Sequence, residues 1–202
     1  MAGRPLTLPQ DAGDAVVMAY YPGTAGGQAI ADILTGETNP AGRLPISWPR
    51  SIGQLPVRFN YLEHLHPLGD DEHPDSYNPR YPFGHGLSYT NFAYRSLDVE
   101  PTSAAPDETV TVTVTVENVG DRQGEETVLV YGHDVVSSRV TPVRTLVAVE
   151  RVTIEAGDSV EVSIPVDVDL FGVVHGQDRR VEPGTIQLAV EDLETSFEIR
   201  DH

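Results

Sequence analysis

Two residue types are missing from this chain of 202 residues, which contains no cysteine and no lysine. The absence of cysteine excludes disulfide bonds, thiolate catalysis and zinc sites with cysteine ligands. No apolar run approaches the roughly 20 residues that cross a bilayer. The first residues, MAGRP, lack the charged and apolar regions of a signal peptide. These absences predict a soluble protein without a membrane partner, and they leave a cytoplasmic and a secreted location equally open.

The charge is strongly one-sided, because 31 acidic residues stand against 13 basic ones and give a net charge of −18. Such a charge repels itself in dilute buffer, whereas molar salt shortens the screening length to about 3 Å. Because lysine is usually common, its absence together with this charge predicts adaptation to high salt. The alternative is an ordinary acidic surface on a mesophilic protein. The same charge argues against nucleic acid as a partner.

The first 50 residues show one βαβ pattern. Residues 15–20 form a continuous apolar run, which predicts a strand buried on both faces. Gly23 turns the chain, Thr24 is expected to cap the following helix, and Gly36 stands where a left-handed cap would end it. Residues 44–48 predict a second short strand. A parallel sheet of two strands needs further partners to cover it, so we expect an incomplete α/β segment.

Residues 51–91 are rich in Pro, Gly, Asn, Asp and His and show no sustained period. We interpret them as an ordered connector, because a free linker is normally poor in aromatic and large apolar residues. The expected anchors are Tyr61, Leu62, Tyr77, Tyr81, Phe83 and Tyr89.

From residue 92 onward, apolar and polar residues alternate. Valines at the even positions 110–116 interleave with threonines at 111–115, which is the period of a half-buried strand. Further alternating segments follow at short intervals, separated by turn signals such as residues 118–121 and 155–158. This pattern predicts an antiparallel β-sandwich over residues 92–202, and hence an α+β chain overall.

Three long motifs carry a family resemblance: PGTAGGQAIADILTG at 22–36, NPAGRLPISWP at 39–49 and YPFGHGLSYT at 81–90. Together they closely resemble the carboxyl-terminal third of glycoside hydrolase family 3, the β-glucosidase and β-xylosidase group. The sandwich resembles the fibronectin type III-like domain that ends many of these enzymes. The resemblance implies three parts: a remnant of the family's C-terminal α/β domain (1–50), the connector (51–91) and an immunoglobulin- or fibronectin III-like sandwich (92–202).

The resemblance implies hydrolysis of terminal β-linked glucose or xylose by the intact enzyme, without a cofactor. Retaining members use an Asp nucleophile from an amino-terminal barrel and a Glu acid/base, about 5–5.5 Å apart. Both would fall before Met1, and Glu37, Glu63 and Glu72 match no catalytic position. We therefore assign no catalytic residue, and we expect the chain to be silent without its partner, the catalytic barrel, which would act on the carbohydrate substrate.

Other clusters favour structural roles. Gly23, Gly26 and Gly27 could cradle a phosphate, but a tight turn into the helix is the better interpretation, because the dinucleotide and P-loop motifs are incomplete. Neither of two charged clusters shows the spacing of a metal site, and we expect no metal. The first comprises His64, His66, Asp70, Asp71, His73 and Asp75. The second comprises Asp167, Asp169, Glu191, Asp192 and Glu194.

His85, in the motif at 83–89, is the one candidate substrate-binding residue, reaching an outer sugar subsite of the intact enzyme. The alternative is that this motif fixes the connector through two glycine-permitted bends and buried aromatic rings.

Three hypotheses remain for the chain as a whole. It is a truncated gene product, one half of a split enzyme, or a free-standing sandwich module that binds carbohydrate or protein. The last would show an exposed row of aromatic residues on one sandwich face.

Overall fold

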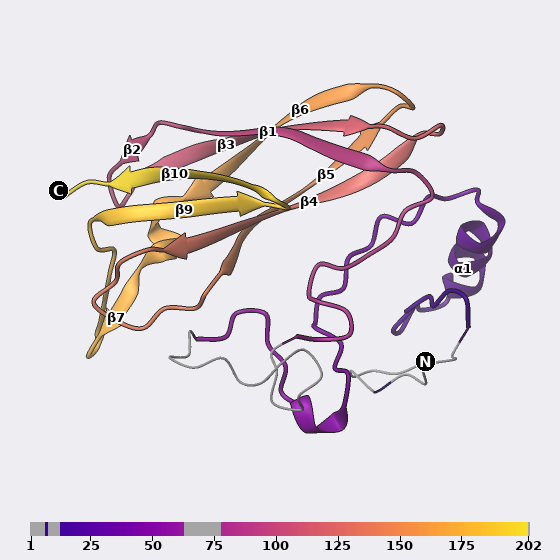
Figure 1. The fold of residues 1–202 in the computed structure, drawn as a ribbon, viewed down its shortest axis with the longest axis horizontal. Coiled ribbons are helices and arrows are strands. Elements are labelled where there is room, and N and C mark those ends of the chain that lie inside the picture. The colour runs from indigo at the N-terminus through magenta and orange to yellow at the C-terminus, as the bar shows by residue number, and fades with distance from the viewer. Residues whose placement is uncertain (1–6, 8–12, 63–77, 202) are drawn as a thin grey trace. The chain divides into compact units, whose positions relative to one another are not determined.

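The computed structural model describes residues 7, 13–62 and 78–201 (Figure 1). The chain divides into two compact units. The first consists of Met1–Phe59 and His64–Tyr89, and the second of Asn60–Glu63 and Thr90–His202. The secondary structure is one α-helix followed by many strands, which confirms the predicted α+β class.

Helix α1 (Gly26–Thr35) is the main regular element of the first unit. It ends as predicted, because Gly36 adopts the left-handed conformation with φ of 80°. Its start differs from the prediction: the N-cap is Ala25 rather than Thr24, and no side chain bonds to the first turn. The turn before the helix is tight, since a Cβ on Gly26 would lie 2.6 Å from the Pro22 ring. This close packing, together with the positive φ of Gly23, supports the structural role predicted for these glycines.

The two strands expected beside this helix are not formed as regular strands. Residues 15–20 have no ladder partner among the described residues, and Val16 and Val17 are about half exposed, at 50% and 51%. In residues 44–48, only Trp48 makes an isolated bridge, with Tyr81. An apolar run becomes a buried strand only when neighbouring strands supply backbone partners and cover its faces. A single-turn 3₁₀ helix, η1 (Ile52–Gln54), follows.

The second unit is a sandwich of two sheets around one core, with a small hairpin (Figure 1). The first sheet has the order β1 (Phe92–Glu100), β3 (Thr109–Asn118), β6 (Ser159–Asp167). The second has the order β2 (Ser103–Ala104), β10 (Leu193–Ile199), β9 (Gly184–Val190), β4 (Gly124–Asp134), β5 (Thr145–Ile154). A 3₁₀ turn, η2 (Val168–Phe171), leads into the hairpin of β7 (Val173–His175) and β8 (Asp178–Arg180). All pairs are antiparallel except β2 with β10.

The alternation predicted for β3 is what builds the core. Val110, Val112, Val114 and Val116 have no exposed surface, whereas the threonines between them are at least partly exposed. Val128 and Val130 of β4, Leu188 of β9 and Phe197 of β10 belong to the same buried cluster. Burying one such side chain contributes about 1.5–3 kcal/mol, so this cluster is the main source of the sandwich's stability. Among the described residues, no helix is long and apolar enough to span a membrane.

Candidate functional site

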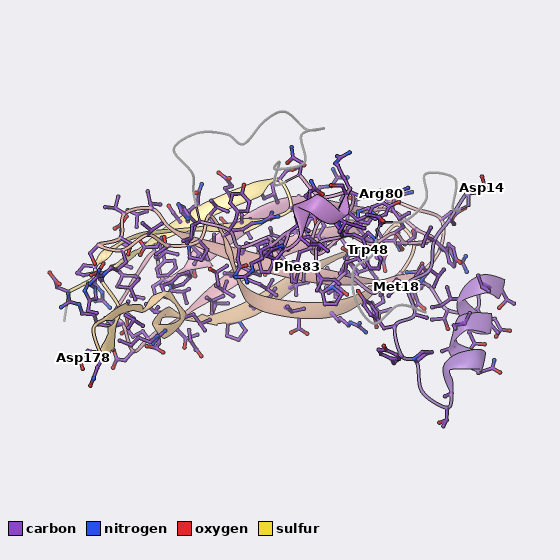
Figure 2. The ribbon with its side chains drawn as sticks, turned by 90° about the horizontal axis from the view of Figure 1, so that it is seen from below. Asp14, Met18, Trp48, Arg80, Phe83 and Asp178 are labelled. Carbon is purple, nitrogen blue, oxygen red and sulfur yellow. The ribbon has the colours of Figure 1, made fainter. Side chains whose placement is uncertain are left out.

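The motif at 81–89 pairs with residues 44–48 along a short irregular ribbon in the first unit. The Trp48 amide donates to the Tyr81 carbonyl at 2.7 Å, and the Arg80 amide donates to the Trp48 carbonyl at 2.8 Å. At the other end, the Leu44 amide donates to the His85 carbonyl at 2.9 Å, and the Gly84 amide to the Leu44 carbonyl at 2.8 Å. Figure 2 labels Trp48, Arg80 and Phe83 in these segments. The ribbon therefore fixes the backbone that carries His85.

The imidazole of His85 is stacked on the Tyr81 ring, with 5.0 Å between centroids and 20° between planes. The guanidinium of Arg80 lies over the same Tyr81 ring, 5.6 Å from its centroid. Burial, and to a smaller extent the charge of Arg43, lower the pKa of His85 below its usual value of 6.5. The ring is therefore neutral at pH 7 and offers one donor and one acceptor rather than a charge.

Gly86 shows why this motif needs glycine. A Cβ at this position would lie 2.4 Å from the Gly42 carbonyl oxygen and 2.9 Å from Nη1 of Arg43. Gly84, two residues earlier, has a positive φ of 82°, which side chains rarely allow. Both features agree with the structural alternative for the motif, in which glycines permit the bends.

Asn39 is a structural residue that the sequence reasoning missed. Its Nδ2 lies 3.0 Å from the Ser88 hydroxyl, and its Oδ1 accepts from the Tyr89 amide at 2.9 Å. The Tyr89 hydroxyl donates to the Ile33 carbonyl at 2.8 Å, near the end of α1. The Asn-Pro pair just after the helix, typical of a turn, was the available signal. These bonds attach the motif to α1 within the first unit.

The structure describes only the second of the two predicted charged clusters. His64, His66, Asp70, Asp71, His73 and Asp75 lie outside the described residues, as do Glu63 and Glu72. In the second cluster, the carboxylates have separate partners: Asp167 accepts from Thr109, Asp169 from Arg179, and Glu194 from Gln187. Across residues 7, 13–62 and 78–201, no group of three or more potential metal ligands is found. Glu37 is exposed.

Ser138, His175 and Glu182 form a cluster in the sandwich that the sequence did not predict. The Ser138 hydroxyl lies 3.0 Å from His175 Nε2 and donates to Glu182 Oε1 at 2.6 Å. Glu182 Oε1 also lies 2.9 Å from the same His175 Nε2, and Glu182 Oε2 accepts from the Ser138 amide at 2.9 Å. These hydrogen bonds lower the pKa of Glu182 to about 2.

This cluster does not have the geometry of a catalytic triad. In a triad, the serine and the carboxylate contact opposite nitrogens of the imidazole, so that the carboxylate orients the ring while the other nitrogen takes the proton. Here both contact Nε2, and Glu182 binds the serine directly. The cluster is therefore a structural clasp, which we call the Glu182 clasp, joining the loop after β4 to the segment around β7 and β8.

Comparisons of sequence and structure with known proteins point to one family. Residues 1–89 match the glycosyl hydrolase family 3 C-terminal domain, and residues 126–193 match a fibronectin type III-like domain. A periplasmic β-glucosidase of Salmonella typhimurium is 37% identical over 94% of this chain, and a β-xylosidase of Formosa agariphila is 34% identical over 96%. The solved β-glucosidase of Listeria innocua, 33% identical, superposes with a TM-score of 0.82 over 97% of this chain.

The share of the relatives that is matched is much smaller. The chain spans 26% of the Salmonella protein, 28% of the Formosa protein and 29% of the Listeria structure. About three quarters of each relative therefore lies outside the matched segment.

Proposed function

We propose that this chain, which belongs to glycoside hydrolase family 3, is a non-catalytic portion of an enzyme that hydrolyses terminal β-glucosyl or β-xylosyl residues. The chain corresponds to the carboxyl-terminal part of the family's enzymes. One observation carries the proposal. Nearly the whole chain is similar to a β-glucosidase and to a β-xylosidase, yet the chain spans only about a quarter of each of these proteins. The nucleophile and the acid/base would come from the region that the match leaves out. The boundaries 1–50, 51–91 and 92–202 remain our proposal for its organisation.

The partner that we propose is the remaining region of such an enzyme, on the same polypeptide or on a separate one. The first unit exposes Val16, Val17 and Leu34, which is typical of an interface. Two polar atoms in this unit, the Tyr20 hydroxyl and Trp48 Nε1, are buried without a hydrogen-bond partner among the described residues. Burying an unpaired polar group costs about 1–3 kcal/mol, so a neighbouring segment that supplied partners would stabilise the unit.

The test is an assay of aryl-β-glucoside and aryl-β-xyloside hydrolysis in molar salt. The chain alone should be silent, as should the part of the Salmonella relative that precedes the matched segment. Turnover only in the mixture would support both the non-catalytic role of this chain and the proposed partner. Association of the two polypeptides without turnover would contradict the catalytic proposal, and a lack of association would contradict the partner. Turnover by this chain alone, abolished by substituting one of its own carboxylates, would overturn the non-catalytic role.

We also propose that His85 contacts the sugar at an outer subsite of the assembled enzyme. A neutral, half-buried imidazole stacked on Tyr81 is suited to exchange hydrogen bonds with sugar hydroxyls. In the active mixture, His85→Ala should raise KM and leave kcat unchanged, because the lost contact would be made equally in the ground and transition states. An unchanged KM with a lowered melting temperature would assign His85 to the structural role instead.

We also propose that the chain is adapted to high salt. The net charge of −18 and the exclusive use of arginine among the basic residues support it. Stability and assembly should both increase as salt screens the acidic surface.

A further inference from the structure

A cavity of about 590 Å³ opens in the sandwich unit, within the segment that matches the fibronectin type III-like domain. It lies between β4, the loop from Arg139 to Thr145, and the segment from Leu170 to Gly176 that holds β7. Figure 1 places β7 at the same end of the sandwich as the C-terminus, and Figure 2 labels Asp178 at the tip of the same hairpin. Its volume is within the range of roughly 300–1,000 Å³ that is usual for small-ligand sites.

One residue of the lining, Gly132, cannot be enlarged without moving its neighbours. A Cβ on Gly132 would lie 2.5 Å from the Phe171 ring, so a larger residue in this position of β4 would displace the ring. Phe171 is itself buried and packs edge-on against Phe197, with 6.0 Å between centroids. Phe171 thus belongs both to the cavity lining and to the packed core.

Several polar residues of the lining have side chains without partners among the described residues. Arg139, Thr141 and Thr145 line it, and their side chains make no hydrogen bond or ion pair with the part of the chain that the structure describes. Asp134 also lines it, and its carboxylate accepts bonds from the Val136 amide and the Ser137 hydroxyl. The lining therefore includes unused donors and acceptors and one carboxylate.

The other walls are aliphatic. Val140, Leu170 and Val174 line the cavity and are 73%, 49% and 59% exposed. The lining therefore combines apolar and polar residues, which suits a ligand that has both kinds of surface.

The walls are held in place by the Glu182 clasp. Glu182 binds the amide and hydroxyl of Ser138, next to Arg139, and contacts His175, next to Val174. One carboxylate thus ties together the two segments between which the cavity opens. The site is built by the fold and does not depend on a free loop.

We propose that this cavity binds a neutral carbohydrate, a pyranose or short oligosaccharide. One guanidinium and one carboxylate in the lining balance in charge, so a simple anion would meet Asp134 and a simple cation would meet Arg139. The acidic chain further repels anions. A sugar ring carries both hydroxyl groups, which can bond to Arg139, Asp134 and the threonines, and CH groups, which can contact the valines and Leu170, so it matches this mixed lining.

The test is NMR titration of the isotope-labelled chain with glucose, xylose, cellobiose and xylobiose in molar salt. We expect saturable shifts at the amides of Gly132, Thr141, Thr145 and Gly172. Arg139→Ala should weaken binding about tenfold, the usual effect of losing a charged hydrogen bond. Arg151→Ala is the matched control, because Arg151 lies in β5, pairs with Glu125 and does not line the cavity; it should bind as the parent does.

Two results would overturn the proposal. The first is the absence of saturable shifts at these amides with all four sugars. The second is a chain that binds no sugar but associates with itself as its concentration rises, and that no longer associates when Val140→Ser and Val174→Ser are combined. Val140 and Val174 would then belong to a protein interface. Because the titration needs no turnover, its failure leaves the hydrolytic role of the family region unaffected.

Discussion

The Thr90 hydroxyl donates a hydrogen bond of 2.6 Å to the side-chain carbonyl of Asn118, which has no exposed surface. The same Asn118 side chain accepts from the Gly120 amide at 3.1 Å and donates to the carbonyls of Arg122 and Ile154 at 2.8 and 3.0 Å. This one buried amide therefore joins the start of the sandwich, the turn after β3 and the end of β5.

Asn118→Ala should lower the free energy of unfolding of the sandwich by about 2–3 kcal/mol, because the buried Thr90 hydroxyl and Ile154 carbonyl would each lose a partner, as would two part-buried backbone groups. Chemical denaturation followed by circular dichroism measures this. Asn91→Ala is the control: Asn91 is exposed, so the change should stay within about 0.5 kcal/mol. Equal effects of the two substitutions would show that the hydrogen bonds of Asn118 do not stabilise the sandwich.

Gly86→Ala should destabilise the first unit by about 1–3 kcal/mol, because the added Cβ would collide with the Gly42 carbonyl. We expect faster hydrogen exchange at the amides of Leu44 and Gly84, whose bonds hold the ribbon. Gly42→Ala is matched to it, since a Cβ there would meet nothing within 4 Å. If Gly86→Ala exchanged like Gly42→Ala, the close approach at Gly86 would have no energetic role.

The Glu182 clasp should make the sandwich sensitive to acid. The pKa of Glu182 is lowered from 4.5 to about 2, so the folded state binds this proton less readily than the unfolded chain. Its contribution to stability is therefore complete above about pH 4.5 and is lost as the pH falls towards 2. Glu182→Gln should lower the melting temperature at pH 6, and the difference from the parent should shrink towards pH 2. A difference that stayed constant over this range would contradict the ionic clasp.

The strands of the sandwich could be predicted because the pattern that specifies each strand lies within its own segment of the sequence. The alternation at 110–116 alone sets which side of β3 is buried, and turn residues at 118–121 and 155–158 separate the strands. The residues at 15–20 could not be predicted in the same way, because an apolar run forms a strand only with neighbours that the chain does not supply among its described residues.

Side-chain sites were less accessible to sequence reasoning than the strands. Ser138, His175 and Glu182 meet across 37 and 44 residues of chain, and no motif spaces them. The cavity likewise depends on how β4, the following loop and η2 pack together. His85 was identifiable only through the motif around it, whereas its contact with Tyr81 follows from the ribbon with residues 44–48.

Residues 15–20 should be the part of the first unit that a partner protects. Amide hydrogen exchange there should be fast in the isolated chain, because Val16 and Val17 are half exposed and the run has no ladder partner among the described residues. Exchange in β3, whose two neighbours are β1 and β6, should be slow. Adding the preceding region of a relative should slow exchange at 15–20 and leave β3 unchanged. Slow exchange of both segments in a monomer would show that the first unit is complete without a partner.

The melting temperature of the chain should depend on salt. The chain carries 31 acidic and 13 basic residues, and the folded state brings these like charges closer together than the unfolded state does. Raising KCl from dilute buffer to molar concentration reduces the screening length from tens of ångströms to about 3 Å, so the melting temperature should rise steeply at low salt and then level off. Potassium chloride is preferred to a sulfate salt, because sulfate also strengthens apolar burial in any protein. Substituting six exposed carboxylates by their amides, at Asp98, Glu100, Asp107, Glu150, Glu161 and Asp192, should reduce the rise without changing the fold. A melting temperature that was independent of KCl in the parent chain would contradict adaptation to high salt.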